Sequence, residues 1–219
     1  MSIYLIRHGE TTSNRDRVVQ HPETPLSGRG RAQAERLALR LADAGIGRIV
    51  SSDLARAAMT AASLARSIGL EVEVDPDLRE RNFGDHRGTS YAELDARGIE
   101  LFAAGYAPPG GETWEAFHQR VDLAWAAATA LTGAPPQPSK PHLALVTHGL
   151  VCHSIAARLV ELPQQLSGHR FGRDGPPLRF GNTAVTVLSG PAPWRIERFA
   201  CTRHLDGETA DDEAAVSGL

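Results

Sequence analysis

The sequence SIYLIRHGET, residues 2–11, places a run of branched apolar residues directly before a charged tip. Residues 2–7 alternate like a buried strand, and Gly9 with the polar residues after it predicts a loop or the start of a helix. The strand therefore ends at Arg7 and His8. This pair suits a phosphate, because the guanidinium neutralises its oxygens and a neutral imidazole is a competent nucleophile near pH 7. Taken alone, the same residues also fit a plain surface turn.

The rest of the chain alternates between helical and strand patterns. Helices are indicated by apolar residues three and four positions apart between capping signals, such as Ser27 before and Gly45 after the first of them. Further helices are expected at 54–68, 112–131 and 150–160, further strands at 49–50, 71–74, 142–147, 183–188 and 194–199, and loops rich in glycine and proline at 133–141 and 163–181. No internal repeat or domain linker is present.

Strands that alternate with helices predict an α/β fold, a three-layer sandwich with a mostly parallel central sheet and helices on both faces. The strand predicted at 142–147 ends at His148, much as the first strand ends at His8. Ligands of such sheets bind beyond the carboxyl ends of the strands. We therefore expect both histidines at one site.

Composition restricts the class of protein. The 219 residues carry 23 basic and 26 acidic side chains, a formal charge of −3 that is ordinary for a globular protein and atypical of a nucleic-acid surface. Apolar runs stay below the roughly 18 residues of a membrane span, and the first residues lack the pattern of a secretory signal. We therefore expect a cytoplasmic protein without membrane contact.

Domain organisation follows from the same survey. Residues 1–203 predict a single domain, and residues 204–219 are acidic without lysine or arginine, as in a solvated, flexible C-terminal tail. The two cysteines, Cys152 and Cys201, have no metal-type or redox-type spacing, so no disulfide framework is expected.

Six motifs, in order along the chain, resemble those of the histidine phosphatase superfamily, also called the phosphoglycerate mutase-like family. They are RHGET at 7–11 with Asn14, PLSGRGRAQA at 25–34, SSDLARA at 51–57 with Thr60, LRERNFG at 78–84 with Gly88, PGGET at 109–113, and VTHG at 146–149. Each motif alone is weak, but their agreement over residues 3 to about 160 is specific. The resemblance implies the same three-layer α/β fold.

The resemblance also implies roles for individual residues. His8 would attack phosphorus and become a phosphohistidine, with Arg7, Arg56 and His148 around the phosphoryl oxygens. The remaining substrate contacts would come from Asn14, Gln20, His21 and Gly149. This assignment agrees with the chemistry, because phosphoryl transfer needs an in-line nucleophile and charge stabilisation of the oxygens.

Glu80 is the expected general acid for the leaving group, and in the second half-reaction the base for water. The competing interpretation is a structural ion pair between Glu80 and Arg79 or Arg81. Two departures from the family pattern affect substrate preference: His21 stands where a glycine is frequent, and Leu150 follows Gly149 where many members have a second glycine.

The resemblance favours hydrolysis over mutase-type transfer, because the segment from Glu80 to His148 is short and the acid loop is of the phosphatase style. The expected substrate is a small phosphomonoester, with no cofactor and no metal. Phosphoglycerate mutase-type transfer stays open as an alternative, as does a non-catalytic phosphoester-binding module. The oligomeric state is left open, with a homodimer among the outcomes.

Two other enzyme classes share residues with this pattern. Cys152 and Arg158 have the C-x5-R spacing of cysteine-dependent phosphatases, but the residues between them lack glycine and predict a helix. His8, His148 and His153 supply three imidazoles for zinc, but the charge of Arg7 opposes a cation and no carboxylate cluster accompanies them.

Overall fold

The computed structural model describes residues 1–133, 139–166 and 178–206. Its centre is a six-stranded sheet in the order β3-β2-β4-β1-β5-β6. The strands are β1 Ser2–Arg7, β2 Ile46–Ser51, β3 Val72–Val74, β4 His142–Thr147, β5 Val185–Ser189 and β6 Arg195–Cys201. The first four run parallel, whereas β5 and β6 are antiparallel to their neighbours. The predicted mostly parallel sheet is confirmed.

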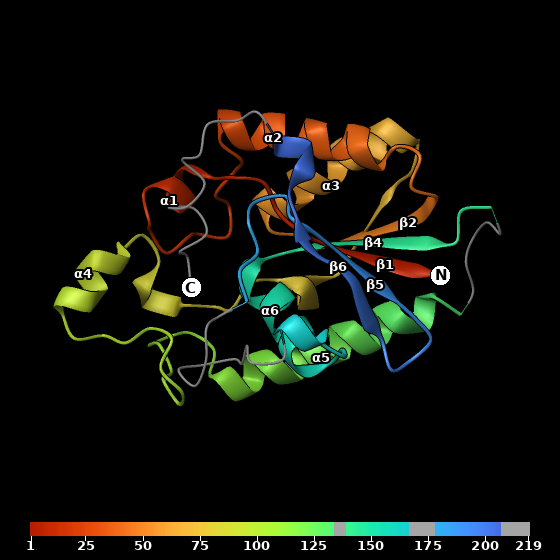
Figure 1. Cartoon of the computed structure of the whole chain (residues 1–219). Coiled ribbons are helices and arrows are strands. Elements are labelled where there is room, and N and C mark those ends of the chain that lie inside the picture. The colour runs from red at the N-terminus through yellow and green to blue at the C-terminus, as the bar shows by residue number, and fades with distance from the viewer. Residues whose placement is uncertain (134–138, 167–177, 207–219) are drawn as a thin grey trace.

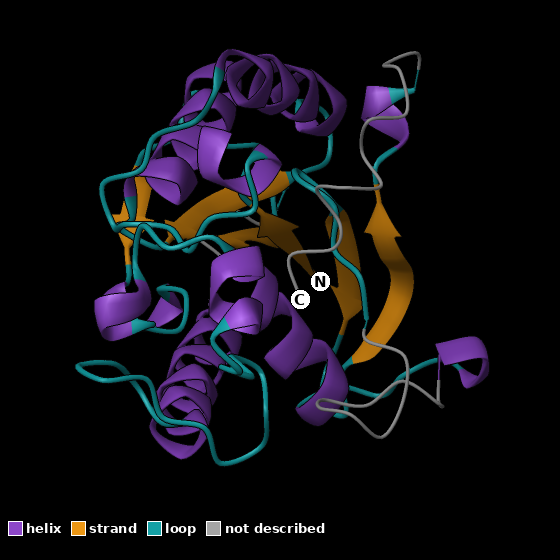
Figure 2. Ribbon diagram, turned by 90° about the vertical axis from the view of Figure 1, so that its left-hand side faces the viewer, coloured by secondary structure: helices purple, strands orange, loops and turns teal. Residues whose placement is uncertain are grey.

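Helices cover both faces of the sheet (Figures 1 and 2). They are α1 Thr12–Arg15, α2 Gly28–Leu41, α3 Ala55–Ile68, α4 Tyr91–Ala96, α5 Trp114–Leu131 and α6 Gly149–Arg158, with short 3-10 turns at Pro76–Leu78, Gly84–His86, Gln164–Leu166 and Arg203–Leu205. Helices α2 and α3 lie on one side and α5 and α6 on the other, which confirms the three-layer sandwich.

Alternation along β1 and β4 divides the core in two. Ile6 and Val146 pack with Leu37 and Leu64 from the α2–α3 layer. The residues on the opposite face pack against the other helical layer; among them are Leu5, Leu145, Phe117, Val121 and Ile155. Because successive strand residues face opposite sides, a strand buried on both faces reads as a continuous apolar run.

The register of β1 and β4 brings the two predicted histidines together. The strands are adjacent and parallel, with Arg7 opposite Thr147. His8 directly follows β1 and His148 directly follows β4. The amide of His8 donates to the carbonyl of Thr147 at 2.9 Å. The expectation of one site at the carboxyl edge of the sheet is therefore confirmed for these two residues.

The structure differs from the predicted elements in three places. Strand β2 is longer than the predicted 49–50, because its amino-terminal half contains Gly47 and Arg48, which interrupt the apolar pattern. Helix α4 is absent from the prediction, since its six residues bury only Leu94. His204 and Leu205, assigned to the acidic tail, instead form a turn in which His204 contacts Arg40 at 2.9 Å.

Parts of three predicted segments, namely residues 134–138, 167–177 and 207–219, lie outside the described residues. Within the described ranges, none of the helices combines the length and apolar character needed to cross a bilayer.

Candidate active site

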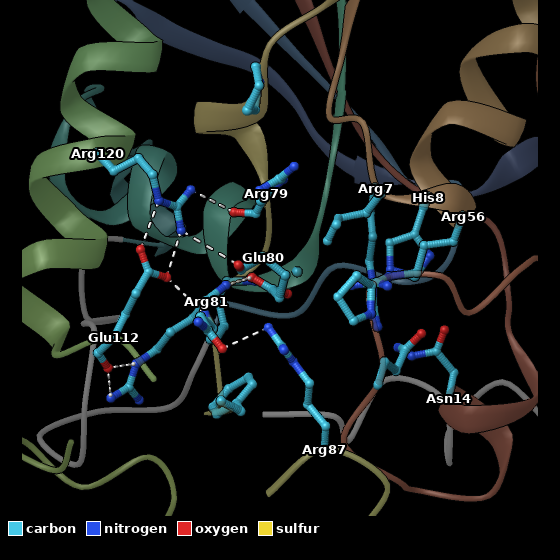
Figure 3. Close-up of a pocket in the computed structure, with 18 of the residues that line it drawn as sticks. Arg7, His8, Asn14, Arg56, Arg79, Glu80, Arg81, Arg87, Glu112 and Arg120 are labelled. Atoms are coloured by element: carbon cyan, nitrogen blue, oxygen red, sulfur yellow. Dashed lines mark hydrogen bonds and ion pairs between the residues drawn. The ribbon is translucent and has the colours of Figure 1, made fainter. Parts of the chain in front are cut away.

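A cavity of about 550 Å³ opens at the carboxyl edge of the parallel strands, the position that α/β sheets use for ligands. Figure 3 shows its side chains converging from several elements. Arg7 and His8 follow β1, Arg56 comes from the first turn of α3, and Glu80 comes from the loop after β3. Asn14, Gln20 and Gly149 also line the cavity. The volume is that of a small-molecule site.

His8 is held as a neutral imidazole. Its ring is 2% exposed, and its Nδ1 lies 2.7 Å from the carbonyl oxygen of Gly9. A carbonyl only accepts, so Nδ1 carries the proton and Nε2 keeps its lone pair for the cavity. Burial, together with the charges of Arg56 and Arg7, lowers the pKa of His8 well below 6.5. The ring is therefore uncharged at neutral pH.

The two arginines beside His8 are buried without carboxylate partners among the described residues. Arg7 donates to the carbonyl of Phe180, and Arg56 donates to the carbonyl of His21 at 3.2 Å. Each Nε is buried and lacks a hydrogen-bond partner in the described part of the chain. Burial lowers the pKa of Arg56 to about 10. Such desolvated, unpaired cations bind an anion strongly.

His148 lies behind His8 and does not line the cavity. The two ring centroids are 5.1 Å apart, and the Nε2 of His148 is 2.9 Å from the hydroxyl oxygen of Ser52. Its Nδ1 is buried with no partner among the described residues. Burial and the charge of Arg56 lower the pKa of His148 well below 6.5. His148 is therefore uncharged beside His8 at neutral pH.

Asn14 is oriented by its neighbours. Its Oδ1 accepts from the amide of Thr11 at 3.2 Å and from the side-chain amide of Asn182 at 3.3 Å, which leaves its own NH2 group to face an anion. Gln20 lies 2.9 Å from the hydroxyl of Thr11. The side chain of His21 is exposed and is not part of the cavity lining, so this residue reaches the site through its carbonyl oxygen.

Glu80 is half-buried, and its side chain lies against the first residues of α6. Its Oε2 accepts from the amide of Leu150 at 3.1 Å, and a Cβ added at Gly149 would lie 3.8 Å from the same oxygen. Burial raises the pKa of Glu80 above its ordinary 4.5, although the Leu150 amide and the Arg56 charge act in the opposite direction. A carboxyl with a raised pKa can carry a proton to a leaving group.

The alternative of a structural ion pair for Glu80 is wrong for both candidate partners. The guanidinium of Arg79 pairs with Asp53. That of Arg81 donates to backbone carbonyls, including Glu112 at 2.9 Å, and lies 3.8 Å from the ring centre of Trp114. Glu80 is therefore left facing the cavity.

The loop that carries Glu80 is fixed by the ion pair of Glu112 with Arg120, and Glu112 belongs to the PGGET motif, whose role the sequence alone does not indicate. Glu112 binds Arg120 through two contacts of 2.8 Å and accepts from the amide of Asn82. Arg120 in turn donates to the carbonyls of Asp77 and Arg79 at 2.7 and 2.9 Å. Glu112 of the PGGET motif at 109–113 thus holds the loop that carries Glu80.

Sequence reasoning missed Asn182, whose side chain is 4% exposed and donates to the carbonyl oxygen of His8 at 3.1 Å. It also missed Ser52 behind His148 and Arg87 in the cavity wall. No local pattern identifies Asn182, whereas Ser52 and Arg87 stand inside or beside motifs that were recognised.

The competing enzyme classes do not fit this geometry. Cys152 is fully buried within α6, where burial raises the pKa of its thiol, and Arg158 pairs with Asp122. The thiolate of a cysteine-dependent phosphatase requires the opposite environment. The described residues hold no group of three or more histidine, cysteine or acidic side chains placed to bind a metal, and His153 is buried in α6 outside the cavity lining.

Fold and site together define an α/β protein with a histidine and two buried arginines at the carboxyl edge of its sheet. The family model of the histidine phosphatase superfamily (branch 1) matches residues 3–195, and the chain belongs to that family. Members of the superfamily are phosphatases or mutases, so the protein is an enzyme of phosphoryl chemistry.

Relatives of both kinds are similar to this chain. Phosphoglycerate mutase-like protein 4 of Arabidopsis thaliana is 37% identical, over 93% of this chain and 86% of that protein. A mycobacterial glucosyl-3-phosphoglycerate phosphatase, solved in complex with VO3, superimposes with a TM-score of 0.75 at 32% identity, covering 91% of this chain and 98% of the other. The α-ribazole phosphatase of Shigella flexneri superimposes with a TM-score of 0.75 at 26% identity, covering 92% of this chain and 97% of the other.

Proposed function

We propose that the protein hydrolyses small phosphomonoesters through a phosphohistidine at His8. The observation that carries the proposal is the hydrogen bond from Nδ1 to the carbonyl of Gly9, which leaves Nε2 as a nucleophile between two unpaired guanidinium groups. A nucleophilic nitrogen flanked by buried cations suits attack on a phosphoryl group and little else.

In the first half-reaction the Nε2 of His8 attacks phosphorus while the bond from phosphorus to the ester oxygen breaks. The leaving alkoxide takes the proton of Glu80. Arg7 and Arg56 neutralise the phosphoryl oxygens, and the amide of Asn14 donates to them. His148 packs against His8 without lining the cavity, so we assign it a positioning role for the His8 ring, with its own Nε2 held by the hydroxyl of Ser52.

In the second half-reaction water attacks the phosphohistidine and transfers a proton to the Glu80 carboxylate. The nitrogen–phosphorus bond breaks, inorganic phosphate leaves, and both His8 and Glu80 return to their starting states. The arginines supply the charge neutralisation that metals supply elsewhere, so the proposed reaction is metal-independent.

A small phosphorylated metabolite is the proposed substrate. Support comes from the size of the cavity and from relatives whose names are phosphatases of glucosyl-3-phosphoglycerate and of an α-ribazole compound. The two cysteines are free thiols, which supports a reducing, cytoplasmic setting.

Phosphoglycerate mutase-type transfer is the second candidate, favoured by the name of the mutase-like plant relative. A mutase must keep water from its phosphohistidine. In this chain the segment between Glu80 and His148 is short, and the cavity reaches Gly149 and Leu150 at its end. Release of inorganic phosphate from a single phosphoglycerate, without isomerisation, separates hydrolase from mutase.

The test combines trapping with chelation. We expect that brief incubation with a 32P-labelled phosphomonoester, followed by alkaline quench, labels the peptide containing His8 with an acid-labile phosphate. A strong chelator should leave the rate unchanged. Label on another residue type, or activity that chelation removes and zinc restores, contradicts the proposal.

A further inference from the structure

The cavity holds more positive charge than one phosphoryl group uses. Six arginines line it: Arg7, Arg56, Arg79, Arg81, Arg87 and Arg120. Arg7 and Arg56 flank His8 at its base. Arg79 is neutralised by Asp53 and Arg120 by Glu112, while Arg81 donates to several backbone carbonyls. Of these four outer arginines, Arg87 is the one whose guanidinium contacts neither a carboxylate nor a backbone carbonyl among the described residues.

Arg87 has no carboxylate partner among the residues that the structure describes. One guanidinium nitrogen donates to the side-chain oxygen of Asn82 at 2.7 Å. In Figure 3 this side chain extends from its loop toward Glu80, between the Arg81 side chain and the group of Arg7, His8 and Arg56. Its other N–H donors are therefore available to a ligand that occupies the cavity.

Hydrogen bonds fix the backbone at Arg87 and the side chain of Asn82. Its backbone amide donates to Gly84 at 3.2 Å, and the next amide, of Gly88, donates to Val19 at 2.8 Å. Asn82, which orients the guanidinium, is itself held because its side-chain oxygen also accepts from the amide of Gly84 at 2.8 Å. A planar fork fixed at one nitrogen is preorganised to bind an oxyanion with the others.

The charge of Arg87 lies close enough to Arg56, beside His8, to affect it. The cation of Arg87 contributes, after burial and Arg7, to lowering the pKa of Arg56. Arg7 and Arg87 therefore lie close enough to Arg56 for their charges to repel, a repulsion that Glu80 opposes. A ligand with two separate anionic groups relieves that repulsion at both ends.

We propose that Arg87 forms a second anion subsite, so that the preferred substrates are phosphomonoesters bearing another acidic group on the leaving alcohol. The inference rests on the proposed hydrolase function. The shared chemistry is an oxyanion, either a carboxylate or a second phosphate, bound by the guanidinium of Arg87 with Asn82 as its positioning residue.

The test uses two esters that differ in the second anion alone, 3-phosphoglycerate and glycerol 3-phosphate. We expect wild-type kcat/KM to favour the carboxylate by about tenfold, mainly through KM, since charge-assisted pairs are strong. Arg87→Met should remove this preference and change glycerol 3-phosphate turnover by less than about twofold. Arg87→Lys should retain part of it.

Arg79→Met is the matched control, because Arg79 lines the same cavity but is already paired with Asp53. It removes an equal charge, so it should leave the preference in place. Equal loss in both variants, or a wild-type enzyme without preference for either di-anionic probe, overturns the subsite. A bisphosphate of propane-1,3-diol, compared with its monophosphate, shows whether a second phosphate is bound instead.

Binding separates this inference from the proposed reaction. In a His8→Ala background, calorimetry should show 3-phosphoglycerate binding about tenfold more tightly than glycerol 3-phosphate, and Arg87→Met should abolish the difference. If the wild-type enzyme hydrolyses phosphomonoesters but the two ligands bind the His8→Ala variant equally, the subsite alone is contradicted. If the ligands differ in affinity but the wild-type enzyme hydrolyses neither, the proposed function is contradicted and the subsite is supported.

Discussion

Two regions of the cavity use arginine in opposite ways. The base, formed by Arg7, His8 and Arg56 with His148 packed against His8, is built on strand and helix ends and leaves its cations without carboxylate partners in the described chain. The rim, formed by residues 79–87 with Glu112 and Arg120, is built on loops; there Arg79 and Arg120 pair with carboxylates, Arg81 donates to backbone carbonyls and Arg87 donates to Asn82. Unpaired buried charge marks where a ligand is bound, whereas paired charge marks what holds a loop.

The largest expected effect comes from the base. His8→Ala removes the nucleophile and should lower kcat by at least about 10⁴-fold for esters of good and poor leaving groups alike. Steady-state rates on nitrophenyl and alkyl phosphates provide the measurement, and circular dichroism checks the fold. Turnover that persists on either ester would place the nucleophile elsewhere.

Substitution of Glu80, which lies between the base and the rim, should affect esters selectively, according to their leaving group. Glu80→Gln is expected to slow hydrolysis of alkyl phosphates by about 10²–10³-fold, because their alkoxide needs a proton. A nitrophenyl phosphate, whose leaving group is stable as an anion, should lose far less. Equal losses across leaving groups reject Glu80 as the acid.

The rim is tested by breaking the pair that supports it. Glu112→Gln leaves Arg120 without its carboxylate, so we expect the free energy of unfolding to fall by about 2 kcal/mol and kcat to fall several-fold as Glu80 moves. Urea titration measures the first effect. The control is Glu93→Gln at the exposed Glu93–Arg97 pair, which should stay within about 0.5 kcal/mol. Similar losses in both variants would contradict a special role for the Glu112 pair.

The smallest expected effect is on the pH profile. His8 must be neutral, so activity is lost as pH falls through its pKa, which burial and the two arginines place well below 6.5. Glu80 must be protonated, so activity is lost as pH rises through a pKa above 4.5. Glu80→Gln should remove the alkaline limb of kcat/KM and keep the acid limb. An acid limb at or above pH 6.5 would show that the arginines do not depress His8.

The base was predictable from sequence, and much of the rim was not. Strand patterns end directly at His8 and His148, and adjacent parallel strands bring their carboxyl ends together, so local signals suffice. Asn182 contacts His8 from the far end of the chain, which no local pattern encodes. The partners of Arg79 and Arg81 likewise depend on how the loops fold back, so the sequence left Glu80 with two interpretations.

The pairing of β1 with β4 has a consequence for biosynthesis. Arg7 and His8 leave the ribosome early, but the strand against which they align, with His148 at its end, follows only after most of the chain. A nascent polypeptide lacking β4 therefore leaves the facing edges of both β1 and β2 unpaired and has no assembled site at their carboxyl ends. We therefore expect the site to assemble late in translation, and a chain truncated before residue 148 to lack the site and to be prone to aggregation.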